Sequence, residues 1–308
     1  MKAIVYKSTG SWYLVKTENG QQWNARMKGI FKTDGMTSTN PIAVGDIVEI
    51  ETENESEQSA IITAIRDRDN YIIRQAPSHK INYHIVAANI GQCLLIATLK
   101  EPRTSQGFID RFLVACEAYH IPAIILLNKS DIYKSKELTK AEEWLGMYAD
   151  VGYRLMLMSI KENKGMEEIR HLLKDKITLV SGHSGVGKSS FINALIPDMM
   201  IKTQDVSGWS GRGIHTTTFA EMHDLSFGGQ IIDTPGMREF GMVDITRQEL
   251  SHYFPEMRQR INQCQFNNCL HLNEPGCAIK KALSEGEIHV ERYISYCNIL
   301  DSINEATY

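Results

Sequence analysis

The feature that most constrains the fold is the stretch VSGHSGVGKSSFINAL at residues 180–195, where an apolar run leads through glycines into an amphipathic pattern. It matches the phosphate-loop pattern G-x-x-x-x-G-K-[ST] with Gly182, Gly187, Lys188 and Ser189. The glycines allow a tight turn whose N–H groups face phosphates, the lysine reaches the β and γ phosphates, and the serine hydroxyl ligates Mg2+. The sequence therefore predicts a strand, a phosphate loop and a helix. The residues expected to contact the nucleotide are Gly182, His183, Ser184, Gly185, Val186, Gly187, Lys188, Ser189 and Ser190.

A second motif, NKSD at residues 128–131, follows the apolar run AIILL. The Asp131 carboxylate can accept hydrogen bonds from two N–H donors on the edge of guanine, which adenine does not offer. Asn128 and Lys129 would brace the base site, with Ser130 between them and the aspartate. A lone four-residue match is more often a turn, but the preceding apolar strand and the phosphate loop favour a guanine-reading role.

Two shorter segments complete the expected nucleotide site. DTPG, Asp233 to Gly236, ends the strand-like run GQIID, so that Asp233 can support Mg2+ and the Gly236 N–H can contact the γ phosphate. MSIKENKG places Ser159 and Lys161 where a second base-contacting loop is expected, although both are also compatible with an ordinary surface loop. Each segment is weak alone and gains weight from the phosphate loop.

The order of these motifs is unusual, because the base-reading elements precede the phosphate-reading elements. A Ras-like domain has the opposite order. The same site can form if the domain is circularly permuted, with the old ends joined and new ends cut in a surface connection. One consequence is that the segment after DTPG leads directly into the C-terminal region.

Between the phosphate loop and DTPG lies DVSGWSGRGIHTTTF, a Gly- and Ser-rich stretch that suits a switch closing on Mg2+ and the γ phosphate through one of Thr216, Thr217 and Thr218. Met237 follows DTPG, where Ras-like enzymes carry the glutamine that orients the attacking water. His215 in the switch is the candidate replacement, although a lone loop histidine often has no such role. The predicted catalytic residues are His215, Lys188 and Thr217.

Near the C-terminus, CQFNNCLHLNEPGC has the spacing C-x4-C-x-H-x5-C. Three thiolates and one imidazole can complete a tetrahedral shell around Zn2+, leaving no open position for catalysis. In a reducing compartment a disulfide cluster is the weaker alternative. Cys93, Cys116 and Cys297 are expected in the core. The predicted ligands of one structural Zn2+ are Cys264, Cys269, His271 and Cys277.

The first 68 residues contain five short strand-like runs separated by turn residues, which predicts a small barrel resembling an oligonucleotide-binding fold. Trp12, Tyr13 and Trp23 are interleaved with lysines and arginines, a composition that suits stacking on bases with cations along the phosphates. The alternative is that these aromatic residues form the barrel core. The acidic run EIETENESE at residues 49–57 is expected to be a solvated hairpin.

Alternating strand and helix patterns from about residue 80 predict a parallel α/β sheet with its ligand site at the strand ends. Residues 245–308 have a mostly helical pattern interrupted by the cysteine-rich insert. Ser284 and Glu287 are spaced as a capping box for a final helix whose apolar stripe would be Val290, Tyr293, Ile294, Cys297 and Leu300. The predicted domains are 1–68, a barrel; 69–244, a permuted GTPase domain; and 245–308, a helical zinc-binding domain.

Length and composition limit the number of domains and the classes of partner. The 308 residues suffice for two or three domains, and the formal charge of -4 gives no global signature of nucleic-acid binding, so that RNA contacts would use local patches. The sequence has no apolar run long enough to span a membrane, and its beginning lacks the pattern of a signal peptide. We therefore expect a cytoplasmic monomer that does not interact with membranes.

Together, NKSD, GHSGVGKSS, GRGIHTTT, DTPGMREF, the barrel and the Cys-Cys-His-Cys pattern resemble one family over essentially the whole chain. It is the circularly permuted, ribosome small-subunit-dependent GTPase A family, RsgA, also called YjeQ. The resemblance implies a late assembly factor that binds the small ribosomal subunit and its rRNA, hydrolyses GTP to GDP faster on the subunit, and then leaves. An RNA-binding scaffold with GTP as a structural or regulatory ligand is the alternative from another class. A zinc-stabilised GTPase that acts without RNA is a third.

Overall fold

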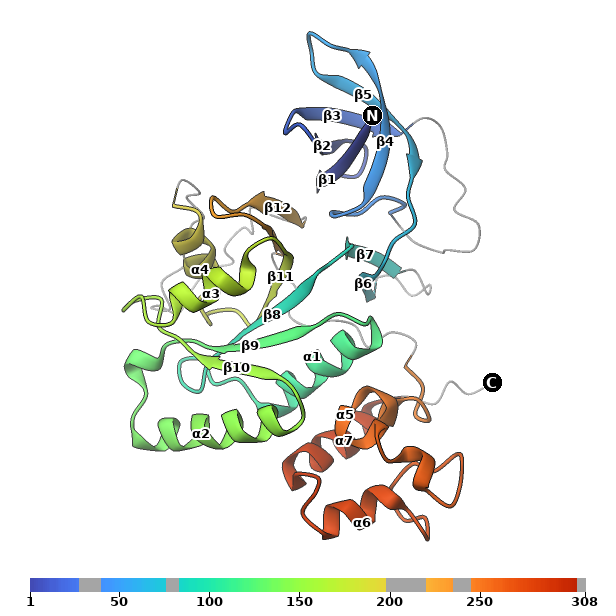
Figure 1. Cartoon of the computed structure of the whole chain (residues 1–308), viewed down its shortest axis with the longest axis vertical. Helices are drawn as coiled ribbons and strands as arrows, with labels where there is room; N and C mark the ends of the chain where they lie inside the picture. Colours follow the sequence, from blue (N-terminus) through green and yellow to red (C-terminus); the bar gives the residue numbers. More distant parts are fainter. Residues whose placement is uncertain (28–39, 76–82, 198–219, 235–244, 304–308) are drawn as a thin grey trace, which may run out of the picture.

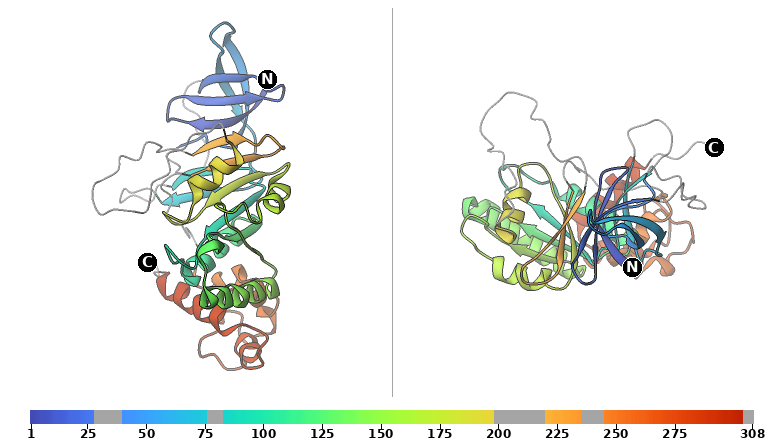
Figure 2. Two further views of the ribbon diagram at one scale, coloured as in Figure 1. Left: turned by 90° about the vertical axis from the view of Figure 1, so that its left-hand side faces the viewer. Right: turned by 90° about the horizontal axis from the view of Figure 1, so that it is seen from above.

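The computed structural model describes residues 1–27, 40–75, 83–197, 220–234 and 245–303, which form three parts stacked along the long axis (Figure 1). A barrel of short strands lies at one end, an α/β layer structure lies in the middle, and a small helical region lies at the other end. Figure 2 shows the same order from the side. The predicted multidomain architecture is confirmed, while the boundaries at residues 68 and 244 stay predictions.

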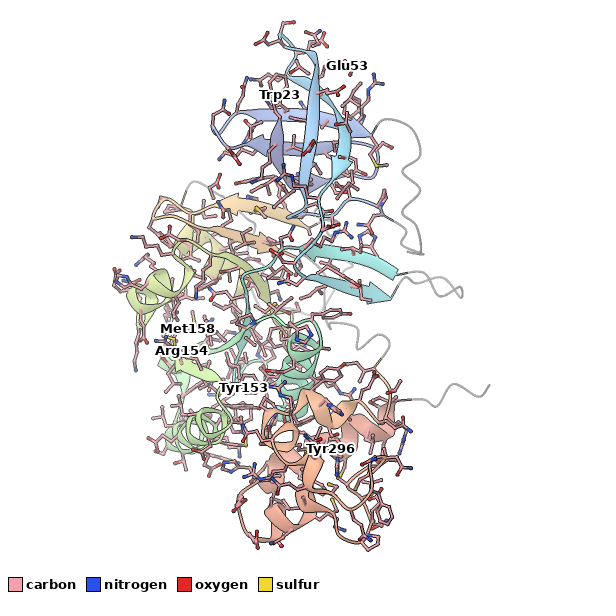
Figure 3. All side chains as sticks on the ribbon, turned by 45° about the vertical axis from the view of Figure 1, so that its right-hand side comes forward. Trp23, Glu53, Tyr153, Arg154, Met158 and Tyr296 are labelled. Atoms are coloured by element: carbon pink, nitrogen blue, oxygen red, sulfur yellow. The ribbon has the colours of Figure 1, made fainter. Side chains whose placement is uncertain are left out.

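The N-terminal part is a closed ring of strands in the order β1-β2-β3-β5-β4, with β4 pairing back to β1. β3 and β5 run parallel, and the other neighbours run antiparallel. Among the strands that the structure describes, ring closure leaves no exposed barrel edge, as in oligonucleotide-binding folds. The acidic run lies on the β4–β5 hairpin, where Glu49, Glu51 and Glu53 are exposed as predicted. Glu53 is labelled in Figure 3. The strands are β1 Lys2–Ser8, β2 Tyr13–Thr17, β3 Gln22–Met27, β4 Ile47–Asn54 and β5 Ser59–Ile65.

The aromatic residues of the barrel divide into two groups. Tyr13 and Trp23 point inward with exposed fractions of 2% and 3%, and they pack with Val15, Ile50 and other members of the barrel core. The base-stacking interpretation is wrong for these two, because the period-2 alternation of β2 and β3 turns both side chains inward. Trp12 precedes β2 in the turn and is half exposed, so it alone of the three offers a ring to a partner.

The central part contains the sheet order β10-β9-β8-β11-β13-β12. All neighbours run parallel except β12, which is antiparallel to β13, so the prediction of a parallel sheet holds for all but this edge strand. The outer edge of β12 pairs with β1 of the barrel at Lys7 and Glu221, making one continuous sheet within the described residues. The strands are β8 Gln92–Ala97, β9 Ala123–Leu127, β10 Arg154–Leu157, β11 Ile177–Ser181, β12 Glu221–Asp224 and β13 Gln230–Asp233.

Helices cover both faces of this sheet. Cys93 and Leu95 of β8 pack in a core with helices α1, Gln106–Ala118, and α2, Ser135–Asp150. Leu94 and Ile96, the alternate residues of the same strand, pack with α3, Met166–Leu173, and α4, Lys188–Leu195. A strand buried on both faces is continuously apolar, which explains the run QCLLIA. A short 3-10 turn, η1, Ser130–Ile132, follows β9.

A separate hairpin lies between the barrel and the central part (Figure 1). Its strands are β6, Tyr71–Gln75, and β7, Tyr83–Ala88, which pair antiparallel. Ile73 and Ile85 form a small core with Ala43, against which Tyr71 and Tyr119 pack. None of the described helices is long and apolar enough to cross a membrane.

The C-terminal part packs against α1 around Val114, Phe254, Met257 and Tyr296. Short helices make up about half of its described residues, and the loops between them hold the metal-ligand pattern. Cys93 and Cys116 are buried in the central core as expected, whereas Cys297 is only half-buried. The elements are η2 Leu250–Tyr253, α5 Pro255–Arg258, η3 Ile261–Gln263, α6 Ala278–Ser284 and α7 Val290–Ser302.

The predicted capping box of the last helix is wrong. Ser284 ends α6, and the chain closes that helix with hydrogen bonds from Glu287 N to Ala282 O (2.9 Å) and from Gly286 N to Leu283 O (3.2 Å). Gly286 adopts φ of 75°, which completes a Schellman motif, and α7 begins only at Val290.

The predicted apolar stripe of α7 is also wrong in part. Val290 and Ile294 are 55% and 52% exposed, whereas Arg292 and Tyr296 are fully buried. The helix is rotated relative to the prediction because buried carboxylates pair with Arg292, a charge that a hydrophobicity pattern assigns to the surface.

Candidate nucleotide site and metal cluster

The predicted nucleotide residues come from different segments that meet at one edge of the central sheet. Asn128 follows β9, Ser159 follows β10, Gly182 follows β11, and Asp233 ends β13. Because these strands are parallel, their carboxyl ends lie at the same edge. Open α/β sheets bind ligands at this edge, so the fold brings together motifs that lie far apart in the sequence.

The phosphate loop connects β11 to α4, as predicted. Gly182 has φ of 146°, and a Cβ there would lie 2.3 Å from Ile96 O of the neighbouring strand. Gly187 has φ of 102°, and a Cβ there would lie 2.5 Å from Asn128 Nδ2. Only glycine fits the loop at these two positions. Ser184 and Gly185 are exposed, while Ser189 and Ser190 are half-buried in the first turn of α4.

Lys188 turns back over the loop. Its Nζ donates hydrogen bonds to Gly182 O (2.5 Å) and to His183 O (2.7 Å). Burial lowers the pKa of this ammonium group, and the Asp233 carboxylate opposes that effect. Burial likewise raises the pKa of Asp233, opposed by the Lys188 charge. A cation and a carboxylate thus lie partly desolvated at the phosphate loop, where charges on a ligand interact more strongly than in water.

Asn128 is buried and ties the base-reading segment to the phosphate loop. Its Nδ2 donates to Val186 O (2.8 Å), and its Oδ1 accepts from Ile160 N (3.4 Å). This side chain therefore links three segments of the chain, while its role at a base site stays a prediction. Lys129 adopts φ of 64°, and its Nζ donates to Glu101 O, so in this structure its side chain lies along the neighbouring loop.

The sequence predicts Ser159 on a second base-contacting loop, but in the structure its hydroxyl contacts Asp131. Ser159 Oγ donates to Asp131 Oδ1 (2.7 Å) and accepts from Glu162 N (3.2 Å). One oxygen of the Asp131 carboxylate is thereby held in place. Lys161 is exposed on the loop that follows Ser159.

Sequence reasoning missed residues that support these motifs. Tyr133 is buried and bridges two segments, because its hydroxyl donates to Asn128 O (2.6 Å) and accepts from Leu99 N (2.9 Å). Burial raises its pKa to about 12, so it stays protonated and can donate. Phe108 packs its ring on that of His183, with centroids 3.6 Å apart. No motif marks either aromatic residue, because their partners are set by the tertiary structure.

Part of the predicted site lies outside the described residues. His215, Thr217 and Gly236 belong to this group, together with Thr216, Thr218 and Met237. The switch and its catalytic histidine therefore remain predictions from the sequence.

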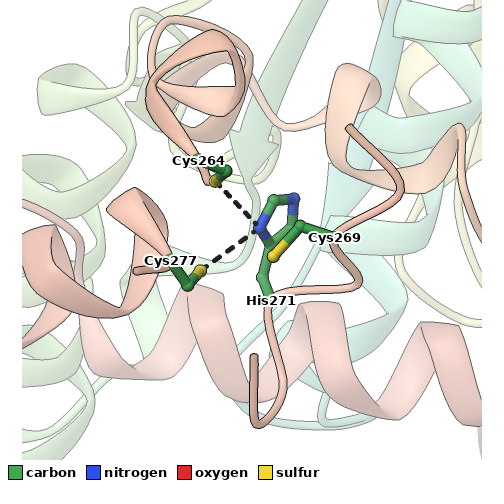
Figure 4. A group of neighbouring side chains, drawn as sticks. All are labelled: Cys264, Cys269, His271 and Cys277. Carbon is green, nitrogen blue, oxygen red and sulfur yellow. Dashed lines mark hydrogen bonds between the residues drawn. The ribbon is translucent and has the colours of Figure 1, made fainter. Parts of the chain in front are cut away.

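The predicted metal ligands lie together in the C-terminal part (Figure 4). The ligand atoms of Cys264, Cys269, His271 and Cys277 all lie within 4.8 Å of one another. His271 Nδ1 is 3.6 Å from Cys264 Sγ and 3.4 Å from Cys277 Sγ. Ligands at the usual Zn–S and Zn–N bond lengths of about 2.3 and 2.0 Å stand about 3.5–3.8 Å apart in a tetrahedron, so the cluster fits one such ion.

The surroundings of the cluster also suit a metal. Burial lowers the pKa of His271, which favours the neutral imidazole that ligates metals. Burial raises the pKa of Cys269 to about 12, so this thiol would need a metal ion to ionise at neutral pH. The Glu274 carboxylate accepts from Leu270 N and Leu272 N and shapes the loop around His271. The cysteines are free, which excludes the disulfide alternative in this structure.

A phosphate loop, an Asn-Lys-Ser-Asp segment that precedes it in the chain, and a carboxylate at the end of β13 define a P-loop GTPase whose motifs are in permuted order. The comparisons with known proteins agree. Residues 65–243 match the family model described as RsgA GTPase, and residues 2–62 match the one described as RsgA N-terminal domain. The chain therefore belongs to the RsgA GTPase family and is a GTP-hydrolysing enzyme.

Curated relatives and solved structures match over nearly their whole length. The Small ribosomal subunit biogenesis GTPase RsgA of Flavobacterium psychrophilum is 48% identical over 99% of this chain and 94% of its own, and that of Cytophaga hutchinsonii is 50% identical over 97% and 98%. The crystal structure of YjeQ from Thermotoga maritima has a TM-score of 0.81 at 32% identity, covering 98% of this chain and 97% of that one. YloQ, described as a circularly permuted GTPase, has a TM-score of 0.76 at 30% identity, covering 98% and 94%.

Proposed function

We propose that this protein is a GTPase that acts in the late assembly of the small ribosomal subunit. In this proposal it binds the subunit and its rRNA, hydrolyses GTP to GDP and phosphate faster on the subunit, and then dissociates as a monomer into the cytoplasm. Relatives named for small ribosomal subunit biogenesis, matched over 94% and 98% of their length, support this role.

The observation that carries the proposal is the meeting of Asn128, Asp131, Lys188 and Asp233 at one sheet edge. We assign guanine reading to Asp131, with Ser159 and Asn128 as its supports. Lys188 would leave the carbonyl oxygens of Gly182 and His183 to bind the β and γ phosphates.

The ion expected with the nucleotide is Mg2+, which GTPases use. The Ser189 hydroxyl and the Asp233 carboxylate would hold it, and when bound it neutralises charge on the β and γ phosphates. Thr217 would join it from the switch. His215 would orient the attacking water in place of the glutamine that the chain lacks, because Met237 follows DTPG.

We assign Zn2+ to the Cys3His cluster in a structural role. Four protein ligands fill a tetrahedral shell, so no position remains for a substrate. The exposed faces of this region and of the barrel, including half-exposed Trp12, are the surfaces that we assign to rRNA.

Steady-state GTP hydrolysis with purified small subunits, large subunits or neither, at two salt concentrations, tests the proposal. We expect stimulation by orders of magnitude with small subunits alone, weakened by salt because phosphate contacts release counterions. Tight GTP binding without any stimulation would instead favour the scaffold alternative.

A further inference from the structure

Helix α1 contacts the phosphate loop through Phe108 and the C-terminal part through η2 and α7. Figure 1 shows it on the side of the central sheet that faces the C-terminal part. None of the sequence motifs lies on this helix, and its residues have no role in the predicted chemistry. Its contacts at the two ends are nevertheless specific side-chain interactions rather than general packing.

At its N-terminal end, α1 touches the phosphate loop through one aromatic pair. The ring of Phe108 lies against that of His183, with centroids 3.6 Å apart and an interplanar angle of 30°. Ser105 Oγ caps the helix by accepting from Phe108 N (3.2 Å). The first turn of α1 is therefore anchored, and a movement of the His183 ring meets a fixed neighbour.

The His183 peptide is also the part of the loop that must respond to a nucleotide. Its carbonyl oxygen accepts a hydrogen bond from Lys188 Nζ (2.7 Å). Phosphates attract the same ammonium group with a full negative charge, so nucleotide binding transfers it from the carbonyl to the phosphates. Nucleotide binding would therefore take the Lys188 ammonium group away from the carbonyl of His183, the residue whose ring packs on Phe108.

Two residues further along the helix, Asp110 connects α1 to α7. Arg292 is fully buried and donates to Asp110 Oδ1 (2.6 Å) and to Glu256 Oε1 (2.7 Å). Its guanidinium also lies 4.6 Å from the ring centroid of Phe254. Separating α1 from α7 would break one ion pair of this fully buried charge cluster, which is costly, so we expect the two helices to move together.

Further contacts continue along the same helix. Val114 is part of the C-terminal core, and Arg111 donates to Ser302 Oγ (3.0 Å) at the end of α7. Near the other end of α1, Arg258 donates to Glu117 Oε2 (2.8 Å), and Tyr153, labelled in Figure 3 where the two parts meet, donates to Glu117 Oε1 (3.1 Å).

We propose that α1 couples nucleotide occupancy of the phosphate loop to the C-terminal part, with Phe108 as the positioning residue at the loop and Asp110 as the link to α7. Binding of GTP or GDP alters the His183 contact with Phe108, and the Asp110–Arg292 pair transmits the shift to α7. By reciprocity, a partner that binds the C-terminal part changes nucleotide affinity by the same factor. The proposal rests on nucleotide binding at this loop, which is part of the proposed function.

Hydrogen exchange of the full-length, metal-loaded protein tests this coupling. Amide exchange is measured over α7 without nucleotide, with GDP and with a non-hydrolysable GTP analogue, each at saturation. We expect nucleotide to change the exchange rates of α7 by about fivefold or more, the lower end of common allosteric couplings. Phe108→Leu should bind nucleotide, with a shifted affinity, and lose the response in α7.

Two further variants make the result decisive. Phe227→Leu is the matched control, since Phe227 is a partly buried phenylalanine of the same domain that packs in the other core, and it should keep the response. Asp110→Asn weakens the contact of α1 with Arg292 of α7 and leaves the contact of Phe108 with His183 in place. This variant should lose the exchange response of α7 even if Phe108→Leu fails to fold.

The outcomes separate the two hypotheses. A response of α7 that survives in both Phe108→Leu and Asp110→Asn would overturn the role of α1, because the coupling would then run through another connection. Absence of any response in the unaltered protein with nucleotide bound would overturn the coupling itself while leaving the proposed GTPase function standing. If the unaltered protein did not bind nucleotide at all, both the coupling and the proposed GTPase function would be wrong.

Discussion

The nucleotide site and the metal cluster are built in opposite ways. The nucleotide site draws on residues spread from Asn128 to Asp233, and the ends of four parallel strands bring them together. The metal cluster draws on residues 264–277 alone, in loops between short helices. Strand pairing fixes the segments of the first site, whereas the second lies in loops without strand pairing, and we expect it to depend on a bound ion.

This contrast predicts how each site responds to the loss of a contact or a ligand. The nucleotide site should tolerate the loss of single contacts, because backbone pairing between strands fixes its segments. The metal cluster should fail as a unit, because binding of a structural metal and folding of its loop are one event. The predictions below test this difference from the largest expected effect to the smallest.

Removal of the metal should have the largest effect. Structural Zn2+ sites carry apparent binding free energies of about 10–16 kcal/mol at neutral pH, so chelation or Cys269→Ser should unfold the C-terminal part. Metal content and amide protection of residues 245–303 measure this effect, and GTP affinity should change far less. The matched control is Cys297→Ser, a half-buried cysteine on α7 outside the cluster. Full protection after complete metal loss would show that the region folds without the ion.

Asp131→Asn should have the next largest effect. The substituted amide can donate a hydrogen bond to the base edge, where the carboxylate could only accept. The loss of two hydrogen bonds to a charged group costs about 3 kcal/mol or more, a factor of about a hundred in GTP affinity. Binding of xanthosine nucleotides should rise in return. Competition between guanosine and xanthosine diphosphates measures the switch, with exposed Asp67→Asn as the control. An unchanged guanine preference would remove Asp131 from base reading.

Ser189→Ala should reduce turnover while sparing much of the nucleotide binding. The hydroxyl is an expected Mg2+ ligand on α4, whereas the loop N–H groups that face phosphates remain. We expect kcat to fall by about tenfold to a hundredfold, the effect of losing one polar contact to a charged group, worth about 1.5–3 kcal/mol. Titration of GTP hydrolysis with Mg2+ should show a raised metal requirement. Unaltered turnover and Mg2+ dependence would contradict this assignment.

Ser159→Ala should have the smallest effect of the four. It removes one hydrogen bond to the Asp131 carboxylate and leaves the carboxylate itself in place. A hydrogen bond to a charged group contributes about 1.5 kcal/mol or somewhat more, so GTP affinity should fall about tenfold without any gain for xanthosine nucleotides. An equal loss of affinity for guanosine and xanthosine nucleotides would indicate this orienting role. If Ser159 read the base directly, only the affinity for guanosine nucleotides would fall.

Some of the architecture follows from local sequence alone. The glycines of GHSGVGKSS require left-handed or close-approach backbone, and the strand and helix that flank them appear where the pattern predicts. The spacing of Cys264, Cys269, His271 and Cys277 also predicted their convergence. In each case the deciding residues lie within about fifteen positions of one another, and local conformation is enough to bring them together.

Patterns of hydrophobicity were less reliable where charge is buried. The stripe predicted for α7 places Val290 and Ile294 inside, but Arg292 occupies the buried face with Asp110 and Glu256 as partners. Burying an arginine without a partner costs much free energy, so the pattern of a single helix predicts that Arg292 is exposed. The pairing becomes favourable only once α1, α5 and α7 lie side by side.

The sequence by itself determined the class of this protein, the order of its motifs and the positions of the two candidate sites, because glycine geometry and ligand spacing act over short stretches of chain. Only the tertiary structure decided that Tyr13 and Trp23 are barrel core, that Ser159 holds Asp131, and that α1 joins the phosphate loop to the C-terminal part. These relations depend on which elements pack together, and a side chain's burial and partners are fixed only when the packing is complete.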